Sequence, residues 1–492
     1  MKPIKKVLVA NRGEIACRIL RTLDRMGLES VMVYHAADAD SPAVKMASEA
    51  IEIDGPTPVA AYLDMDRLVA VCQETSADAL HPGFGFLAEN SEFARRLAGV
   101  GLTFIGPSPE NIELMGDKIK ARAFCIENGF PLSPSVSEDS LGTPFVKQAA
   151  RLGLPLLIKA AAGGGGKGMQ IVYLQEDLEP AIKLAKTAAR RAFGDDRIYA
   201  ERYEETPRHV EVQILADEHG NIVHLGEREC SIQRRFQKII EESPAPGLSA
   251  ELRSRIWTTA VEIACQAGYR NAGTIEFLLS PGGDYFFLEM NTRIQVEHPV
   301  TEMVTGLDLV EMQIRIAQGE PLPFNQGDID ITGHAIELRI YAEDPENDFL
   351  PTTGQVLFRS FPRGDGVRVD HGVSDGMKVT SAFDPMLAKL IVYGQTRAEA
   401  IQRVRSAIAE TSILGVTTNA DYLARIVAHP AFASGLIHTG FIPRYAGDLK
   451  PPELTTHQRS LLIAAVALAS TEITNPEFEI KAPYASIGKW RN

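Results

Sequence analysis

A run of glycines between two apolar segments restricts the fold of this chain more than any other feature. The tract Gly163–Gly168, which contains one lysine, Lys167, lies between the strand-like segments Leu156–Lys159 and Met169–Tyr173. A dinucleotide-binding fingerprint would open a helix, and a Walker A loop would place Ser or Thr after its lysine, so neither motif fits. A glycine loop between two strands can instead fold over phosphate oxygens, because no Cβ blocks access to its backbone N–H groups. The alternative is a flexible hairpin tip without a ligand.

The pattern of strands and helices changes along the chain, whose 492 residues allow roughly three domains. In the first segment strand-like and helix-like stretches alternate, which predicts a parallel sheet covered on both faces. In the centre, antiparallel pairs such as Arg208–Leu215 with Ile222–Glu227 lie between helices and predict an α+β module with a mobile flap. A mixed region follows from His334 to about Tyr445. We therefore expect a multidomain fold of the α/β and α+β classes.

Composition excludes several classes of protein. Hydrophobic residues make up 45% and charged residues 23%, which excludes wholesale disorder. The 50 basic and 64 acidic residues give a net charge of −14, so no basic field favours nucleic acid or an anionic membrane. The cysteines are odd in number and widely separated, which argues against zinc sites and disulfides: Cys17, Cys72, Cys125, Cys230 and Cys265. No apolar stretch reaches the ~20 residues that span a bilayer, and we expect a soluble, cytoplasmic protein.

Two glutamates and an asparagine predict a magnesium site. Glu289 and Asn291 follow the apolar run Tyr285–Leu288. Glu276 lies on the preceding strand-like run, and the turn Ser280–Asp284 would fold the two runs back on each other. Carboxylate and amide oxygens suit Mg²⁺, which shares its remaining sites with nucleotide phosphates. Without a cation the two glutamates would repel each other, and one would have to take up a proton.

Polar residues near this site predict binding of an anion and of phosphate. Arg293, Gln295 and Glu297 alternate, so a strand-like stretch would aim all three side chains at one side. An arginine fork and a glutamine donor suit a small planar anion, and a nearby glutamate base would allow its activation by phosphoryl transfer. Lys159 ends an apolar strand and needs a partner for its charge, for which a nucleotide phosphate is the obvious candidate. Lys118, at the start of a helix, is by itself typical of a solvated surface residue.

Together these motifs resemble the biotin carboxylase family of the ATP-grasp superfamily, and in detail the biotin carboxylase part of acyl-CoA carboxylase α chains. The resemblance rests on Asn11–Ala16, His81–Asn90, the glycine tract, Pro207–His209, Glu227–Arg235, Glu289–His298 and Arg339–Pro345. It implies a Rossmann-like domain at 1–115, an ATP-grasp domain at 116–330 with a lid at about 131–204, a C-terminal domain at 331–446, and a tail or linker at 447–492. The implied activity is that of an ATP-dependent ligase, catalysing the first half-reaction of a biotin-dependent carboxylase.

The resemblance also implies a role for individual residues. The residues implied to contact ATP are Lys118, Lys159, Gly165, Gly166, Met169, Glu201, Arg202, Tyr203, Glu204, His209, Gln233 and Phe236. Those implied to hold Mg²⁺ (or Mn²⁺) are Glu276, Glu289 and Asn291. Those implied to surround bicarbonate are Lys238, Arg293, Gln295 and the backbone of Val296. Glu297 is then the base that deprotonates bicarbonate, and Arg339 is the cation that steadies the biotin enolate.

Two positions depart from the family pattern, and two other functions stay open. Phe236 stands where many relatives carry a polar residue on the nucleotide side, and Glu204 replaces an apolar residue at the adenine edge. One alternative is another ATP-grasp ligase, which would join an activated carboxylate to an amine. Another is a nucleotide-binding assembly subunit without turnover.

The expected partners follow from a missing motif. Biotin carriers present their lysine in an Ala-Met-Lys-Met turn, which does not occur in this sequence. We therefore expect biotin to be a substrate on a separate carrier protein or domain, not covalently attached to this chain. The segment Ala485–Asn492 is similar to the join to the next domain of an acyl-CoA carboxylase α chain. We expect a carboxyltransferase subunit as a partner, in a homodimer or a larger complex, and we expect no binding to nucleic acid or to a membrane. The sequence leaves open which acyl-CoA is finally carboxylated.

Overall fold

The computed structural model describes residues 3–138, 144–161, 169–453 and 455–473. The predicted glycine loop, with Gly165 and Gly166, lies outside these ranges. The chain divides after Leu449 into two compact units, which are described separately.

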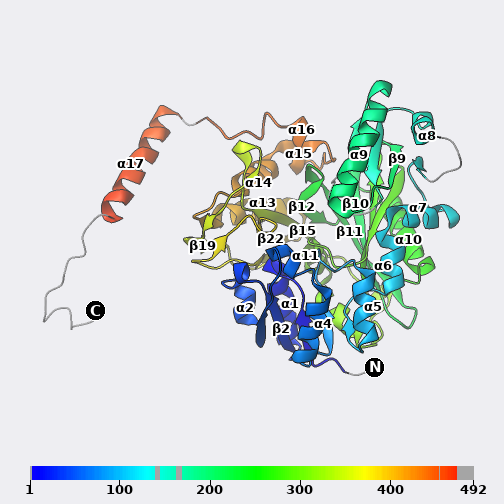
Figure 1. Ribbon diagram of the computed structural model, residues 1–492. Coiled ribbons are helices and arrows are strands. Elements are labelled where there is room, and N and C mark those ends of the chain that lie inside the picture. Colours follow the sequence, from blue (N-terminus) through cyan, green and yellow to red (C-terminus); the bar gives the residue numbers. More distant parts are fainter. Residues whose placement is uncertain (1–2, 139–143, 162–168, 454, 474–492) are drawn as a thin grey trace. The chain divides into compact units, whose positions relative to one another are not determined.

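The N-terminal part of the first unit is a parallel sheet in the order β3-β2-β1-β4-β5. Its strands are β1 (Lys6–Val9), β2 (Glu29–Tyr34), β3 (Glu49–Glu52), β4 (Ala79–His81) and β5 (Thr103–Phe104), and its helices include α1 (Gly13–Arg25), α4 (Met65–Glu74) and α5 (Ser91–Gly99) (Figure 1). Val7 and Val9 belong to the same apolar core as α1, whereas Leu8 packs with α4 and α5. The sheet is therefore buried on both faces, which explains the continuous apolar run of β1 and confirms the predicted fold class for this part.

An antiparallel sheet of eight strands follows, in the order β14-β13-β10-β11-β12-β15-β22-β20. Its strands are β10 (Arg208–Ala216), β11 (Ile222–Arg234), β12 (Gln237–Ser243), β13 (Asn271–Leu279), β14 (Tyr285–Asn291), β15 (His334–Tyr341), β20 (Val367–His371) and β22 (Met386–Gly394). Because β12 pairs with β15, one sheet joins the central part of the chain to its C-terminal part. Residues far apart in the sequence thus share one rigid surface.

A separate four-stranded antiparallel sheet has the order β6-β9-β7-β8. Its strands are β6 (Ser135–Ser137), β7 (Leu156–Ala160), β8 (Gln170–Val172) and β9 (Ile198–Arg202), and α8 (Phe145–Arg151) and α9 (Leu178–Phe193) accompany them (Figure 1). Leu156, Ile158 and Val172 pack with residues of both helices in a core of their own. β7 and β8 pair with each other, so the two strands predicted to flank the glycine tract are confirmed.

Shorter elements complete the first unit. The remaining helices are α2 (Pro42–Met46), α3 (Pro58–Ala61), α6 (Pro109–Gly116), α7 (Lys118–Glu127), α10 (Ala250–Gln266), α11 (His298–Thr305), α12 (Leu309–Ala317), α13 (Arg397–Glu410), α14 (Ala420–Ala428), α15 (Pro430–Ala433) and α16 (Phe441–Arg444). Three short strand pairs are β16 (Glu343–Asp344) with β17 (Leu350–Pro351), β18 (Gly354–Gln355) with β21 (Lys378–Val379), and β19 (Phe358–Ser360) with β23 (Ser412–Leu414).

The second unit contains α17 (Thr456–Ile473). Among the described residues of the whole chain, no helix combines the length and the apolar character needed to cross a membrane.

Candidate active site

A cavity of about 970 Å³ lies where the two antiparallel sheets and the N-terminal part meet. Every predicted site residue that the structure describes lines it: Lys118, Lys159, Met169, Glu201, Arg202, Tyr203, Glu204, His209, Gln233, Phe236, Lys238, Glu276, Glu289, Asn291, Arg293, Gln295, Val296, Glu297 and Arg339. Residues from sequence positions more than two hundred apart are therefore brought to one place. Gly165 and Gly166 are outside the described residues.

The four-stranded sheet contributes a buried lysine to this cavity. Lys159 on β7 is 5% exposed and forms an ion pair with Glu201 on β9. Arg122 of α7 approaches the other oxygen of Glu201, with Nη1 3.3 Å from Oε2. The lysine thus has a partner for its charge, as its burial requires, and this partner is a carboxylate of the same sheet.

Lys118 is less exposed than its position in the sequence indicated. It is the first residue of α7, its side chain is 17% exposed, and its Nζ lies 2.5 Å from Oε2 of Glu289. Burial alone would lower the pKa of Lys118, but the neighbouring carboxylate of Glu289 raises it above the usual value. The ammonium therefore stays charged beside the predicted metal ligands.

The three predicted metal ligands lie together on the β13–β14 hairpin. Glu276 and Glu289 are directly paired across the two strands, at a point where the register shifts between Glu276 and Phe277. Asn291 donates from Nδ2 to Oε1 of Glu276 at 2.8 Å. Two carboxylates and an amide oxygen on adjacent strands are a donor set that fits a hard divalent cation.

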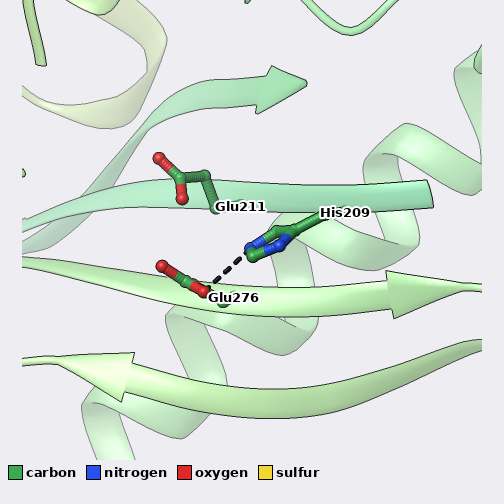
Figure 2. Close-up of side chains that lie close together, drawn as sticks. All are labelled: His209, Glu211 and Glu276. Carbon is green, nitrogen blue, oxygen red and sulfur yellow. Dashed lines mark ion pairs between the residues drawn. The ribbon is translucent and has the colours of Figure 1, made fainter. Parts of the chain in front are cut away.

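Glu276 is not the glutamate that takes up a proton. His209 Nε2 lies 2.8 Å from Oε2 of Glu276 (Figure 2), and Lys238 Nζ lies 2.8 Å from Oε1 of the same carboxylate. Burial would raise the pKa of Glu276, but Lys238 and His209 outweigh it and hold the pKa well below 4.5. Neighbouring side chains thus supply the compensation that was expected from a proton.

Lys238 on β12 contacts three buried carboxylates. Its Nζ lies 2.5 Å from Glu211, 2.8 Å from Glu276 and 2.8 Å from Glu297. Burial would lower the pKa of Lys238, but the three glutamates raise it well above 10.5. Each of the three N–H donors of the ammonium group therefore has a carboxylate acceptor.

Glu297 lies between this lysine and an arginine. It is 0% exposed, and its Oε2 accepts a hydrogen bond of 2.9 Å from Nη2 of Arg339. The same guanidinium group lies 2.5 Å from Glu241 on β12. Burial would raise the pKa of Glu297, but Lys238 and Arg339 hold it well below 4.5, so the carboxylate is ionised and able to accept a proton.

The segment after β14 is irregular, so the strand-like stretch predicted for Arg293–Glu297 is wrong. β14 ends at Asn291 and α11 begins at His298, with Pro299 in its first turn. Arg293 nevertheless faces the cavity with its neighbours, because it donates to Oδ1 of Asn291 and to Oε1 of Gln295, both at 2.8 Å. Local hydrogen bonds, not strand periodicity, bring these side chains to one side.

Phe236 lies at the tip of the β11–β12 hairpin. It is 44% exposed, and Arg235 and Phe236 have φ values of 50° and 67°. Two consecutive positive φ values are typical of a tight hairpin turn. Arg234 fixes this end by donating to both oxygens of Glu343 at 2.8 and 2.9 Å. The aromatic ring is therefore held at the edge of the cavity.

Sequence reasoning missed three acidic residues that hold the site together. Glu211 contacts Lys238, Glu241 contacts Arg339, and Glu89 lies with Oε2 3.1 Å from Nε of Arg293. Glu211 could have been found, because it lies two residues after His209 on β10 and so shares its face of the sheet (Figure 2). Nothing in the local sequence distinguishes Glu241 from a surface glutamate.

Comparisons with known proteins agree along the chain. Three family models match: "Biotin carboxylase, N-terminal domain" at residues 3–112, "Carbamoyl-phosphate synthase L chain, ATP binding domain" at 117–325, and "Biotin carboxylase C-terminal domain" at 337–444. Mitochondrial methylcrotonoyl-CoA carboxylase subunit alpha from Dictyostelium discoideum is 46% identical over 100% of this chain and 71% of its own length. Biotin carboxylase 2 from Bacillus subtilis is 49% identical over 89% of this chain and 99% of its own length.

Solved structures give the same result. The biotin carboxylase domain dimer of 2-oxoglutarate carboxylase from Hydrogenobacter thermophilus, in complex with MgADP, ADP and bicarbonate, has a TM-score of 0.89 at 42% identity, covering 92% of this chain and 100% of that one. Biotin carboxylase from Campylobacter jejuni in complex with β,γ-ATP has a TM-score of 0.87 at 42% identity, covering 90% and 99%. The fold, the cavity and these similarities together show that this chain belongs to the biotin carboxylase family of ATP-dependent ligases with an ATP-grasp fold.

Proposed function

We propose that the protein carboxylates biotin in this cavity and uses ATP to activate bicarbonate. In this proposal, charged residues at one end of the cavity bind the nucleotide, and charged residues at the other end bind bicarbonate. The observation that carries the proposal is the position of Glu297, a buried and ionised carboxylate held between Lys238 and Arg339. A base placed between two cations can receive a proton at one side while anionic groups are held at the other.

The nucleotide end is assigned to the residues around Lys118 and Lys159. Both ammonium groups are paired with glutamates that line the cavity, so both are positioned to exchange a carboxylate for a phosphate group. Glu276, Glu289 and Asn291 would hold a magnesium ion, which supplies charge neutralisation between the phosphate groups. His209, Gln233, Met169, Phe236 and the segment Glu201–Glu204 complete the assignment to ATP.

The bicarbonate end is assigned to Lys238, Arg293, Gln295 and the backbone of Val296. In this assignment bicarbonate attacks the γ-phosphate after Glu297 has taken its proton, and carboxyphosphate and ADP are formed. Glu297 becomes a stronger base once Lys238 turns from it to the substrate, because a lost cation raises the pKa of the carboxyl group.

Arg339 is assigned to biotin. Carboxyphosphate breaks down to carbon dioxide and phosphate, the phosphate accepts the proton of the ureido nitrogen, and that nitrogen attacks carbon dioxide. A guanidinium group held by two glutamates is oriented in advance to stabilise the enolate oxygen of biotin.

We further assign three domains, at 1–115, 116–330 and 331–446, with residues from about 131 to 204 as a lid and 447–492 as a tail or linker. The separate apolar core of the four-stranded sheet supports the lid, because such a sheet can move as one body. Closure would keep water from the labile carboxyphosphate.

The partners follow from the relatives. We propose that the biotin substrate is attached to a carrier protein or domain other than residues 1–492, and that a carboxyltransferase and a homodimeric or larger assembly complete the enzyme. The sequence lacks an Ala-Met-Lys-Met turn, and the similar biotin carboxylase domain from Hydrogenobacter thermophilus was solved as a dimer. A cytoplasmic location is supported by five free cysteines, whereas several relatives are named mitochondrial.

The test is phosphate release by the purified chain with ATP, magnesium, bicarbonate and free biotin. We expect release to depend on both biotin and bicarbonate. Release that depends on an amine instead of biotin would favour a carboxylate–amine ligase. Binding of ATP without release, at saturating biotin and with a biotinylated carrier, would favour an assembly subunit.

A further inference from the structure

The loop between β14 and α11 carries the predicted bicarbonate contacts, and two side chains outside the mechanism above hold its backbone. We propose that His298 and Lys389 are positioning residues that fix the two peptide groups on either side of Val296, and so aim the Val296 N–H and the Glu297 side chain at bicarbonate. This inference rests on the proposed function, because it assumes that bicarbonate binds at this loop.

His298 holds the first of these peptide groups. Its Nδ1 lies 2.7 Å from the carbonyl oxygen of Gln295, and the ring is 0% exposed. A carbonyl oxygen can only accept, so Nδ1 must carry the proton. Burial holds the pKa of His298 well below 6.5, and the nearby cations Lys389, Arg18 and Arg368 lower it further. The ring is therefore neutral, and its single proton is committed to this hydrogen bond.

The position of the Gln295 carbonyl determines the direction of the next N–H. In a trans peptide group the C=O and the N–H point to opposite sides. His298 binds the carbonyl from the protein side, so the N–H of Val296 is turned toward the cavity, which Val296 lines. A backbone donor fixed in this way is available to an anion without reorganisation.

Lys389 holds the second peptide group. It is 0% exposed on β22, and its Nζ donates to the carbonyl oxygen of Val296 at 2.8 Å. That peptide group also contains the N–H of Glu297, so Lys389 fixes the backbone from which the base extends. Lys389 is directly paired with Arg339 on β15, and side chains of directly paired residues lie on the same face of a sheet. The eight-stranded sheet thus positions both the base and the arginine that contacts it.

A second contact of the Lys389 ammonium group connects the N-terminal part of the chain. Its Nζ lies 3.2 Å from Oε2 of Glu14, a buried residue in the first turn of α1. A buried ammonium group is tolerated only when its donors have partners. One side chain therefore links α1, the loop after β14 and the eight-stranded sheet at the backbone of the proposed base.

The experiment measures biotin-dependent phosphate release against bicarbonate and, separately, against ATP, for the full chain, for two variants at His298 and for three variants at Lys389 and Glu14. His298→Leu should raise the KM for bicarbonate about tenfold, the effect of losing one buried hydrogen bond, and should leave the KM for ATP unchanged. His298→Asn can place an amide N–H near the position of Nδ1, so we expect it to return the KM for bicarbonate close to the wild-type value. A residue that only fills space would not be rescued by the smaller, polar asparagine.

Lys389→Met should reduce kcat by roughly 100-fold, within the range typical of a displaced general base. This variant leaves the buried Glu14 without its ion-pair partner, so Glu14→Gln combined with Lys389→Met removes both members of the pair and should show the same kinetic defect in a folded protein. Glu14→Gln alone keeps the bond to Val296 and should retain most of the wild-type kcat.

The outcomes separate this inference from the proposed function. If the wild-type chain shows no bicarbonate-dependent turnover, the proposed function fails and this inference fails with it. If the wild type turns over and folded His298→Leu keeps its KM for bicarbonate, or His298→Asn is as defective as His298→Leu, only the inference is overturned. The His298 series decides the question on its own if neither Lys389 variant folds.

Discussion

The two antiparallel sheets that line the cavity hold their charges differently. On the four-stranded sheet, the cavity-facing pair of Lys159 and Glu201 is made within the sheet itself. On the eight-stranded sheet, Lys238 and Arg339 share carboxylates that come from several strands and from the loop after β14. A sheet with local pairing can shift as a body without separating its charges, whereas a shared network keeps its members together.

This difference implies a division of roles. Buried ion pairs are strongly disrupted when one partner is removed, because the other charge is left without compensation. Substitutions in the network of Lys238, Glu297 and Arg339 should therefore affect bond formation, and substitutions of Lys159 or Glu201 should affect binding of the nucleotide. The four predictions below test this division, beginning with the largest expected effect.

Glu297→Gln should lower biotin-dependent turnover by roughly 10²–10⁴-fold, the usual contribution of a general base. The amide keeps the size of the side chain but cannot accept the proton of bicarbonate. ATP affinity, measured by calorimetry, should stay close to that of the wild type, because Glu297 contacts Lys238 and Arg339 and not Lys118 or Lys159. The exposed residue Glu251 provides the control Glu251→Gln. Normal turnover by Glu297→Gln would contradict both the base and the division of roles.

Lys159→Met should reduce kcat/KM for ATP by roughly 10–100-fold, the effect of losing about 1.4–3 kcal/mol of a charge-assisted contact. The KM for bicarbonate should change little, since Lys159 lies on the other sheet. Steady-state kinetics with each substrate varied in turn measures this difference. Lys147→Met, at an exposed position on α8, is the matched control. A rise in the KM for bicarbonate equal to that for ATP would erase the distinction between the sheets.

Glu241→Gln should alter how stability depends on pH. Burial raises the pKa of Glu241 to about 7 from the ordinary 4.5, although Arg339 lowers it in part. The folded protein thus binds more protons than the unfolded chain between these values, and its contribution to stability is lost as pH rises through about 7. As pH rises through this window, the free energy of unfolding should therefore fall by about 1–3 kcal/mol less in Glu241→Gln than in the wild type. Urea unfolding on either side of this window measures the slope.

The matched control for that slope is Glu262→Gln, at an exposed position on α10, which should keep the wild-type pH dependence. An identical slope in Glu241→Gln and wild type would show that this carboxyl group does not titrate in the window. The eight-stranded sheet would then hold its charges without a pH-dependent contribution from Glu241.

Phe236→His should have the smallest effect. A histidine at the hairpin tip offers a donor at the edge of the cavity, and one exposed hydrogen bond should lower the KM for ATP by about two- to fivefold. Phe358→His, at another half-exposed position, is the control. An unchanged KM would show that the aromatic residue at this edge does not limit nucleotide binding.

Much of the fold was predictable because its signals are local. The alternation in the first segment predicted the parallel sheet, and the turn at Ser280–Asp284 predicted the hairpin in which Glu276 pairs with Glu289. The segment Arg293–Glu297 was predicted as strand-like because its polar residues alternate. Hydrogen bonds to Asn291 and Gln295 instead give it an irregular backbone with the same side chains toward the cavity.

The sequence by itself determined the family, the elements and the residues that line the cavity, since periodicity, turns and motifs act over short stretches of chain. Only the tertiary structure decided which charges meet. Burial raises the pKa of Glu241, although Arg339 lies beside it and lowers it in part. Lys389 donates to the carbonyl oxygen of Val296, which is 93 positions away in the sequence. Desolvation and Coulomb interactions depend on distance in space, so the ionisation states and the partners of these groups exist only once the sheets have assembled.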